Sequence, residues 1–306
     1  MRKVLIASDK PFASSAVGRI ATILSGAGYE VRKLEKYTQK EELLEAVAHV
    51  DAMIVRSDIV DRDVLEAAHN LAIVVRAGAG YDNVDVQAAT AKNICVMNTP
   101  GQNANAVAEL AIGLALYGLR EFFSGKSGGE LRGRTLGLHG YGYVARNVKR
   151  IADAFGMRVL VYTRYSKAQA AAEGLELVHS LEELYAASDV ISIHVPARGE
   201  HIKSVSYDVL QYLKGDAVIV NTARKEVVNE EQLVRIMTEK PGVKYLSDIE
   251  PDCKDIFEEK FRGRFYFTPK KLGAQTTEAN TNAGVAAAEQ IVAFFEKGDQ
   301  TFRVNK

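Results

Sequence analysis

The sequence predicts an α/β protein built from two parallel sheets, and three observations lead to that prediction. Short β-branched runs alternate with helical patterns along almost the whole chain, an arrangement that places helices on the faces of a parallel sheet. The runs are continuously apolar instead of alternating, as expected of strands buried on both faces. The length of 306 residues corresponds to two domains at about 150 residues each.

Two series of apolar runs follow one another along the chain. The first is expected to form one sheet and comprises Val4–Ala7, Ala52–Val55 and Leu71–Arg76. The second is expected to form another sheet and comprises Thr135–His139, Arg158–Tyr162, Val190–Val195, Ala217–Ala223 and Val243–Ile249. Polar loops follow the runs of the second series, and most of them lead into a helix, so one α/β unit is followed by another.

A long helix is predicted to connect the two series, because apolar residues recur at helical spacing over residues 103–123. The stretch 124–134 is rich in glycine and charge, has no periodicity, and predicts an exposed loop. The last helix is expected at Thr277–Phe295. Two helix starts have the spacing in which each side chain accepts a hydrogen bond from an unpaired backbone amide; they are Ser180 with Glu183 and Asn229 with Gln232.

The composition excludes several classes of function. Lys and Arg together number 39, as do Asp and Glu, so the formal net charge is zero and no nucleic acid partner is expected. No apolar run approaches the ~20 residues of a membrane span, and the first ten residues do not form a signal peptide, so a cytoplasmic protein without a membrane partner is expected. Cys95 and Cys253 are too few for a disulfide framework or a thiolate zinc site, and no metal site is predicted.

A glycine-rich fingerprint indicates dinucleotide binding. Gly140-x-Gly142-x-x-Ala145 directly follows a predicted strand and opens a helix. In that context the glycines allow a tight turn and a close approach of the backbone to a pyrophosphate, while Ala145 permits close helix packing. The alternative is a glycine-rich turn that binds nothing. The intervening residues Tyr141, Tyr143 and Val144 belong to the candidate cofactor site.

The end of the next predicted strand bears on the choice of cofactor. In dinucleotide-binding sheets an acid about 20 residues after the fingerprint usually binds the ribose 2′-hydroxyl of NAD. This strand instead ends Tyr162-Thr163-Arg164. A guanidinium suits the 2′-phosphate of NADP, so Arg164 favours NADP. NAD stays open if Arg164 is a solvated loop residue.

A second glycine pair occurs in Arg76-Ala77-Gly78-Ala79-Gly80, which also follows a predicted strand. It lacks the third small residue of a dinucleotide fingerprint, because Asn83 occupies that position. Backbone amides in such a loop are able to cradle a small anion such as a carboxylate. A purely structural turn is the alternative.

Seven segments, in order and with preserved spacing, resemble a single family. They read VRSDIVD, RAGAGYDNVD, NTPGQNANAVAEL, LHGYGYVARNV, HVPARGE, NTARKEVV and TPKKLGAQT. Over nearly its full length the chain is similar to the D-2-hydroxyacid dehydrogenases, and within that family it most resembles the short-form D-3-phosphoglycerate dehydrogenases. Seven ordered motifs are far more specific than the fingerprint alone.

The resemblance implies two doubly wound domains, with the active site in an interdomain cleft. A flavodoxin-like substrate-binding domain would comprise residues 1–101 and 279–306, and a Rossmann dinucleotide-binding domain residues 102–278. The resemblance also implies a homodimer formed through the long helix after Asn103 and its flanking loop. Similarity to the short form further implies that feedback by serine through a C-terminal domain is absent.

The resemblance assigns roles to individual residues. Arg224 matches the arginine that holds the substrate carboxylate and carbonyl oxygen, for which its fork of donors is suited. Arg56 and Ser57 match contacts to the phosphate end of the substrate, with ordinary salt bridges as the alternative for Arg56 and Arg76. Further implied substrate contacts are Arg76, Asn103 and the loop of Gly78, Ala79 and Gly80; implied cofactor contacts are Thr163, His194, Val195, Pro196, Thr222, Ala223, Arg224 and Asp248.

One segment departs from the family pattern. The family's proton-transfer residue is a histidine after Thr-Pro, whereas here Thr268-Pro269 is followed by Lys270 and Lys271. Alignment from Thr-Pro favours Lys270 for proton transfer, with Lys271 as an orienting neighbour; alignment backward from Gly273 selects Lys271 instead. An ammonium is able to protonate the alkoxide that forms when a 2-oxo acid is reduced. The alternative is that Lys270 only binds an anion.

Two consequences follow from a lysine in this role. The ammonium must lose its proton before it accepts one, so the rate of substrate oxidation is expected to rise into the alkaline range. The family also has a supporting acid upstream, for which Glu250 is the candidate, although its spacing is shorter than usual and a loop carboxylate is the alternative.

Together these observations predict an NAD(P)-dependent oxidoreductase that interconverts D-3-phosphoglycerate and 3-phosphohydroxypyruvate at the entry to serine biosynthesis. One alternative is a glyoxylate or hydroxypyruvate reductase of the same family, which Arg56 and Ser57 argue against because such substrates carry no phosphate. The other is a dinucleotide-sensing binding protein on this fold. Loss of the histidine favours the sensor, and retention of Arg224 opposes it.

Overall fold

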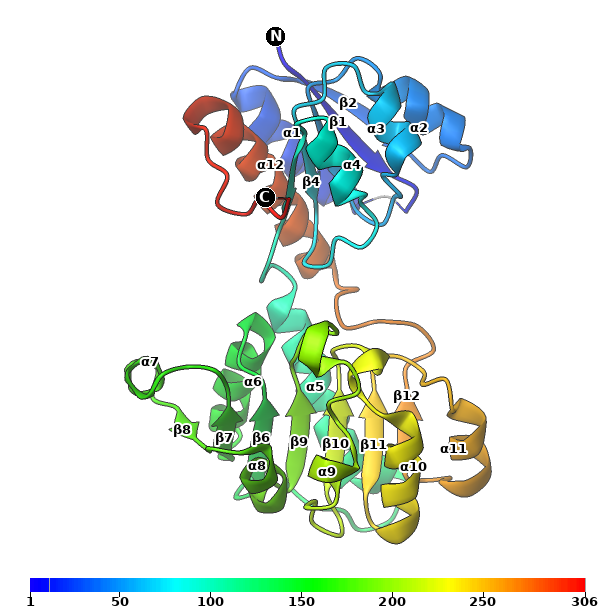
Figure 1. Ribbon diagram of the computed structural model, residues 1–306, viewed down its shortest axis with the longest axis vertical. Coiled ribbons are helices and arrows are strands. Elements are labelled where there is room, and N and C mark those ends of the chain that lie inside the picture. Colours follow the sequence, from blue (N-terminus) through cyan, green and yellow to red (C-terminus); the bar gives the residue numbers. More distant parts are fainter. Residues whose placement is uncertain (11, 306) are drawn as a thin grey trace. The chain divides into compact units, whose positions relative to one another are not determined.

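The computed structural model describes residues 1–10 and 12–305, which form two compact units. Unit 1 comprises residues 1–103 and 275–306, and unit 2 comprises residues 104–274 (Figure 1). These boundaries differ by two and four residues from those expected at 101/102 and 278/279. Pro11 and Lys306, which the sequence analysis assigned to the first domain, lie outside the described residues.

Unit 1 has a parallel sheet with the strand order β2-β1-β3-β4-β5. Its strands are β1 (Lys3–Ser8), β2 (Glu30–Glu35), β3 (Ala52–Val55), β4 (Ile73–Arg76) and β5 (Cys95–Asn98). Its helices are α1 (Ser14–Gly26), α2 (Lys40–Val47), α3 (Arg62–Ala67), α4 (Val86–Ala91) and α12 (Thr277–Lys297). This order is that of a doubly wound flavodoxin-like sheet, which reverses direction between β1 and β3.

Both faces of this sheet are buried, as the apolar runs predicted. Val4 and Ile6 of β1 pack in the cluster that includes α1 and α12. Leu5 and Ala7, which alternate with them, pack in the cluster that includes α2, α3 and α4. Because successive side chains of a strand point to opposite faces, continuous apolarity is required when helices cover both.

Unit 2 has a parallel sheet with the strand order β12-β11-β10-β9-β6-β7-β8. Its strands are β6 (Thr135–His139), β7 (Arg158–Tyr162), β8 (Glu176–Leu177), β9 (Val190–Ile193), β10 (Val218–Asn221), β11 (Lys244–Ser247) and β12 (Phe265–Phe267). Its α-helices are α5 (Ala104–Leu119), α6 (Tyr143–Ala154), α7 (Lys167–Ala172), α8 (Leu181–Ala187), α9 (Tyr207–Leu210), α10 (Glu230–Glu239) and α11 (Lys254–Lys260). Short 3₁₀ turns lie at Glu121–Phe123, Gly199–His201 and Lys225–Val227.

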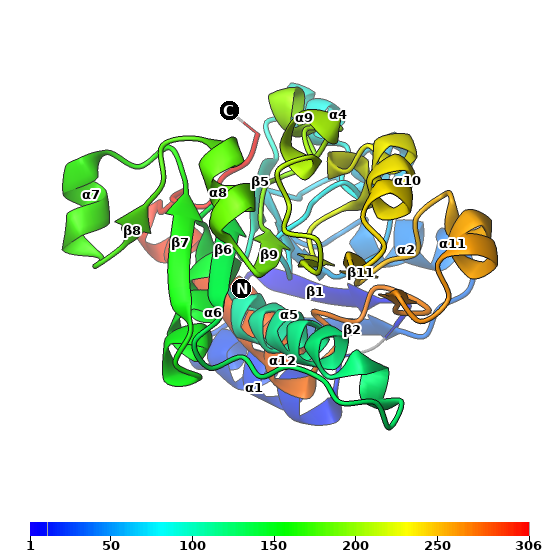
Figure 2. The same cartoon turned by 90° about the horizontal axis from the view of Figure 1, so that it is seen from below.

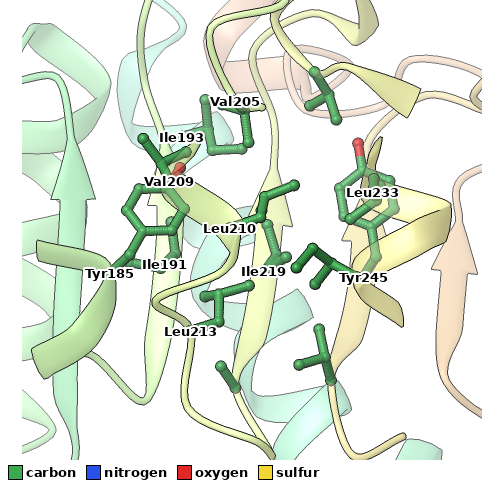
Figure 3. Close-up of a cluster of buried hydrophobic side chains, with 14 of the residues drawn as sticks. Tyr185, Ile191, Ile193, Val205, Val209, Leu210, Leu213, Ile219, Leu233 and Tyr245 are labelled. Carbon is green, nitrogen blue, oxygen red and sulfur yellow. The ribbon is translucent and has the colours of Figure 1, made fainter. Parts of the chain in front are cut away.

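Two apolar layers enclose the unit 2 sheet. Helices α5 and α6 pack on one face, and α8, α9 and α10 pack on the other (Figure 2). Figure 3 shows part of the second layer, where Tyr185 of α8 and Leu210 of α9 meet Ile191 of β9 and Ile219 of β10. The order from β8 to β11 is that of a Rossmann sheet, with its reversal between β6 and β9. The prediction of two doubly wound α/β domains is therefore confirmed.

The predicted helices are confirmed, and each of the predicted cap side chains accepts a hydrogen bond from a backbone amide. Ser180 and Asn229 each accept from the backbone three residues on. Glu183 accepts from the amide of His179, and Gln232 accepts from the amide of Tyr207. The loop 124–134 is exposed apart from half-buried Gly129, Arg134 and the buried Leu131. Among the described residues, no helix is both long and apolar enough to cross a membrane.

Candidate active site

The fingerprint loop of unit 2 lies where the sheet reverses direction. Gly140 follows the last residue of β6, and its amide donates to the carbonyl of Tyr162 at the end of β7 (3.0 Å). Gly140 has a φ of +95°, and a Cβ there would lie 2.8 Å from the backbone oxygen of His194. Both the backbone angle and the lack of space therefore require glycine at this position.

The start of α6 is open for an anion. Gly142 precedes the first residue of this helix of 12 residues, and a Cβ at Gly142 would have no heavy atom within 4 Å. The amides of the first turn have no partners within the helix and carry its positive dipole end. A tight glycine turn followed by an open helix start fits the pyrophosphate of a dinucleotide.

His139 and His194 flank the glycine turn as neutral groups, His139 buried and His194 half-buried. His139 is 2% exposed, and its Nδ1 lies 3.1 Å from the hydroxyl of Tyr185. Burial lowers the pKa of His139 to about 4, and burial together with His139 lowers the pKa of His194 to about 3. The Nε2 of His194 lies 2.8 Å from the hydroxyl of Ser192. Near pH 7 neither ring carries a charge. The two rings therefore place polar but uncharged groups beside the glycine turn, and Val195 and Pro196 directly follow His194 in the chain.

A buried carboxylate fixes the segment that carries the two lysines. Asp248 is 1% exposed and directly follows β11. Its Oδ1 accepts from the hydroxyl of Thr268 (3.1 Å) and the amide of Leu272 (2.7 Å), and its Oδ2 accepts from the amide of Gly273 (2.9 Å). These bonds hold residues 268–273 at the carboxyl edge of the sheet.

The turn after β10 brings two cationic side chains to one carbonyl group. Asn221 shapes this turn, because its Oδ1 accepts from the amide of Ala223 and its Nδ2 donates to the carbonyl of Arg224. A guanidinium nitrogen of Arg224 donates to the carbonyl of Ala223 (3.1 Å), and Nζ of Lys271 donates to that same oxygen (2.8 Å). Lys270, by contrast, is exposed.

Two further residues of this region differ in their surroundings. The hydroxyl of Thr222 is buried and has no hydrogen bond to any residue that the structure describes. Such an orphaned group at the end of β10 fits a ligand-binding position. The carboxylate of Glu250, in the loop after β11, forms an ion pair (2.7 Å) with Lys254, the first residue of α11. The structure thus pairs Glu250 with Lys254 and not with Lys270 or Lys271.

The substrate candidates of unit 1 lie at the carboxyl edge of its sheet. Arg56 directly follows β3. Its guanidinium nitrogens donate to the carbonyl of Lys10 (3.1 Å) and to Oδ1 of Asn280 (2.6 Å). The hydroxyl of Ser57 lies 3.4 Å from a carboxylate oxygen of Asp9. Burial lowers the pKa of Arg56, although this cation stays charged at any ordinary pH. Arg56 and Ser57 therefore lie beside the point where this sheet reverses direction.

The second glycine loop is held beside the end of β4. A Cβ on Gly78 would fall 1.4 Å from a guanidinium nitrogen of Arg76, so the arginine lies directly against the glycine. Asn98 donates to the carbonyl of Ala79 (2.6 Å), and the amide of Thr99 donates to the carbonyl of Gly78 (2.9 Å). Arg76, the last residue of β4, pairs in register with Val55, the residue before Arg56. The two arginines therefore lie at the carboxyl ends of neighbouring strands.

Some residues that shape these sites were not singled out from the sequence. Asp58, 3% exposed, accepts from the amides of Arg56 and Asp9 and from the hydroxyl of Tyr37. Asn280, in the first turn of α12, orients Arg56 from more than 200 positions away in the chain. An acid in the loop soon after β3 was the available signal for Asp58, whereas local sequence gives no signal for Asn280. Among the described residues, no His, Cys, Asp and Glu side chains gather as a metal site.

Comparison with known proteins establishes the family. Residues 5–305 match the family model described as D-isomer specific 2-hydroxyacid dehydrogenase, catalytic domain. The chain therefore belongs to the D-isomer-specific 2-hydroxyacid dehydrogenase family, a class of oxidoreductases. The nicotinamide dinucleotide implied by this family fits the glycine turn, the open helix start and the orphaned hydroxyl of Thr222.

Individual relatives carry different names. A D-3-phosphoglycerate dehydrogenase of Methanocaldococcus jannaschii is 36% identical over 287 residues, covering 86% of this chain and 53% of the relative. A hydroxypyruvate reductase of Thermotoga maritima is 34% identical, covering 86% of this chain and 90% of the relative. The crystal structure of 3-phosphoglycerate dehydrogenase from Entamoeba histolytica with NAD+ bound has a TM-score of 0.87 and 44% identity, covering 100% of this chain and 99% of that one. The chain spans about half the length of several of the curated relatives.

The buried histidines predict acid sensitivity. The pKa of His139 is about 4 in the folded chain and about 6.5 in an unfolded one. Between these values the unfolded chain binds a proton that the folded chain does not, so stability falls as the pH decreases through this range. We expect His139→Asn to reduce the loss of unfolding free energy between pH 7 and pH 5 by about 2 kcal/mol. Urea unfolding at both pH values measures this difference.

The matched control is His49→Asn, because His49 is exposed. This variant should lose stability on acidification as the unsubstituted protein does. An equal loss in all three proteins would show that His139 is not the group responsible.

Proposed function

We propose that the protein is an NAD(P)-dependent D-3-phosphoglycerate dehydrogenase, which interconverts D-3-phosphoglycerate and 3-phosphohydroxypyruvate in serine biosynthesis. Unit 1 then supplies the candidate phosphate-binding side chains, and unit 2 binds the dinucleotide and supplies Arg224. The observation that carries this proposal is the pair of arginines, Arg56 and Arg76, at neighbouring strand ends beside the loop of Gly78 and Gly80. A phosphorylated carboxylic acid requires cations at both of its ends, and the names of two relatives from different organisms agree with this substrate.

Arg224 is proposed to bind the substrate carboxylate and to polarise the oxygen at C2. Its backbone is fixed by Asn221, and its guanidinium makes one hydrogen bond to Ala223. The remaining donors of the guanidinium fork are suited to a carboxylate and to the charge that develops on oxygen. Ser57, Ala79 and Asn103 are proposed as further polar contacts of the substrate.

The bound nicotinamide supplies hydride transfer at C2 of the substrate. When the substrate is oxidised, its C2–H bond would break and the electron pair would pass as hydride to the bound oxidised nicotinamide, while the hydroxyl proton would pass to a neutral lysine amine. In reduction the lysine ammonium returns that proton to the oxygen. The hydrogen bond from Lys271 to Ala223, beside Arg224, supports Lys271 for this step over the exposed Lys270.

The remaining proposed roles concern support and cofactor contacts. Because Glu250 is paired with Lys254, we propose only an electrostatic influence of this carboxylate on the lysines. Asp248 is proposed to accept a hydrogen bond from the nicotinamide carboxamide in addition to fixing the lysine segment. The proposed cofactor contacts are Gly140, Tyr141, Gly142, Tyr143, Val144, Thr163, Arg164, His194, Val195, Pro196, Thr222 and Ala223.

The test of substrate class compares 3-phosphohydroxypyruvate with hydroxypyruvate, each with NADH and with NADPH. We expect kcat/KM to be at least about a hundredfold higher for the phosphorylated substrate, because its phosphate gains charge-assisted hydrogen bonds. Arg56→Gln should lower kcat/KM about tenfold or more for this substrate alone. Arg62→Gln, at an exposed arginine of the same unit, is the matched control.

Equal or reversed preference would contradict the proposed substrate and favour a hydroxypyruvate or glyoxylate reductase, a function carried by the Thermotoga relative's name. Absence of turnover with every pair, together with dinucleotide binding, would favour a sensor.

The proton-transfer step is tested by single lysine variants. We expect Lys271→Ala to lower kcat by about 10²–10⁴, the usual contribution of a general acid or base, with a smaller change in KM. The rate of oxidation by the unsubstituted enzyme should rise with pH into the alkaline range, and this rise should be absent from Lys271→Ala. Steady-state kinetics from pH 6 to 10 measure both effects.

Lys270→Ala is the matched comparison, since it removes the same charge one residue away. A large loss of kcat in Lys270→Ala with little change in Lys271→Ala would reverse the assignment. Equal, small losses in both would contradict proton transfer by either lysine.

A homodimer through α5 and the loop after it is also proposed. Phe123, at the end of the 3₁₀ turn after α5, is 66% exposed, and Leu116 and Tyr117 of α5 are only half-buried. Such exposed aromatic surface is typical of an interface. We expect the protein to elute as a dimer in size-exclusion chromatography with light scattering, and Phe123→Asp to elute as a monomer.

Phe155→Asp is the control for this test, because Phe155 is 45% exposed at the far end of α6. That variant should remain a dimer. A monomeric unsubstituted protein would overturn the proposed assembly.

A further inference from the structure

A cluster of four side chains surrounds the end of β7 and was not part of the fingerprint pattern. One guanidinium nitrogen of Arg146 donates to the hydroxyl of Tyr165 (2.5 Å) and forms an ion pair with Glu173 (2.9 Å). The ring of Tyr141 lies edge-on to that of Tyr165, with centroids 5.9 Å apart. The guanidinium carbon of Arg146 lies 5.6 Å from the Tyr141 ring centroid. We call these four residues the Arg146 cluster.

The cluster lies beside the fingerprint. Tyr141 lies between the two fingerprint glycines, and the amide of Arg146 donates to the carbonyl of Gly142. Tyr165 directly follows Thr163 and Arg164 after β7, while Glu173 lies at the end of α7 (Figure 1). In this fold the end of the second strand faces the adenosine ribose of a dinucleotide.

The end of β7 has no acidic residue, and Glu173 supplies one from the end of α7. It reaches the site from α7 and balances the charge of Arg146, and both side chains keep contact with solvent, being 28% and 45% exposed. Its influence extends to the fingerprint loop, where burial first and Glu173 second raise the pKa of Tyr141. Arg164 is exposed and forms no ion pair with another described residue. Arg146 and Arg164 are therefore cations at this strand end, Glu173 is the anion in contact with Arg146, and Asp153 acts on Tyr141 as a further anion.

We propose that Glu173, acting through Arg146, makes the site select NAD over NADP; this inference rests on the proposed dinucleotide binding. The 2′-phosphate of NADP carries about two negative charges, and it would meet the carboxylate of Glu173. To bind that phosphate, Arg146 would have to give up its ion pair. A 2′-hydroxyl needs no such exchange, because it donates to the carboxylate or accepts from Tyr165. Glu173 is therefore a specificity-determining residue and Arg146 its partner.

The experiment measures dissociation constants of NADH and NADPH from their fluorescence, which requires no turnover. We expect the unsubstituted protein to bind NADH more tightly. Glu173→Gln should tighten NADPH binding about tenfold, because the freed guanidinium gains a charge-assisted bond to phosphate, while the NADH constant changes little. Adding Arg146→Gln to this variant should abolish the gain.

Glu176→Gln is the matched control. Glu176 is ion-paired with Arg158 at the opposite end of β7, so this variant removes an equal charge from the same strand pair away from the cluster. Its two dissociation constants should equal those of the unsubstituted protein. Thermal melting of each variant confirms that all of them fold.

The outcomes separate this inference from the proposed function. Tighter NADPH binding in Glu173→Gln, lost in the double variant, supports the inference whether or not the protein turns over 3-phosphohydroxypyruvate. An unchanged ratio of the two constants, or a preference for NADPH in the unsubstituted protein, overturns the inference and leaves the proposed reaction standing. Failure of the unsubstituted protein to bind either dinucleotide overturns both.

Discussion

Parallel strand pairing is the constraint on which the rest of the structure depends. Every pair of strands in both sheets is parallel, so the chain returns to the start of each new strand across a face of the sheet. Within each unit the loops that follow the strands therefore emerge at one edge. Arg56 and Arg76 meet at that edge in unit 1, and Gly140, His194 and Arg224 occupy it in unit 2.

Each unit then fixes its loops with one buried carboxylate. Asp58 accepts three hydrogen bonds around the loop of Arg56, and Asp248 accepts three around the segment of Lys271. A buried carboxylate is costly unless its oxygens are hydrogen-bonded, and here the bonds come from backbone amides and hydroxyls instead of cations. The hydrogen bonds of each carboxylate thus fix the backbone of the loop that carries the candidate arginine or lysine.

The sequence predicts the interior of each sheet better than its margins. The strands that the apolar runs identified lie inside the two sheets, whereas β2, β5, β8 and β12, which were not singled out, are the edge strands. Among these edge strands, β2 is partly or fully exposed at each position and β8 has only two residues, whereas β5 is buried at Cys95, Val96 and Met97. The caps divide in the same way. Ser180 and Asn229 accept from amides of their own helices, and Glu183 accepts from the nearby amide of His179. Gln232 instead accepts from the amide of Tyr207, which is distant in the sequence.

In the candidate site, too, some residues are predicted by their neighbours in the sequence, whereas the roles of others depend on residues far away in the sequence. Gly140 is recognisable because it belongs to a glycine pattern within one turn, although the backbone oxygen that leaves no room for a Cβ belongs to the distant His194. The choice between Lys270 and Lys271 is not local, because a one-residue difference in register decides it and the carbonyl of Ala223 lies 48 positions away. Asn280 is invisible for the same reason, as its contact with Arg56 joins residues 224 positions apart. Motifs therefore identify the loops, and long-range hydrogen bonds decide which side chain of each loop faces its partner.

Electrostatic selectivity is harder still to predict from a motif, because charges that are distant in the sequence act on one another when they are close in space. Arg164 alone suggests a site for a 2′-phosphate, since it stands where an acid is usual. The field at that strand end is the sum over all nearby charges, however, and Glu173 contributes to it from the end of α7 while holding Arg146 in an ion pair. A carboxylate in contact with a guanidinium removes more positive potential than a distant one, because the attraction falls with distance and with solvent between the charges. The residue type at a single motif position is therefore not enough to predict the cofactor, because every charge of the cluster contributes to the field at that strand end.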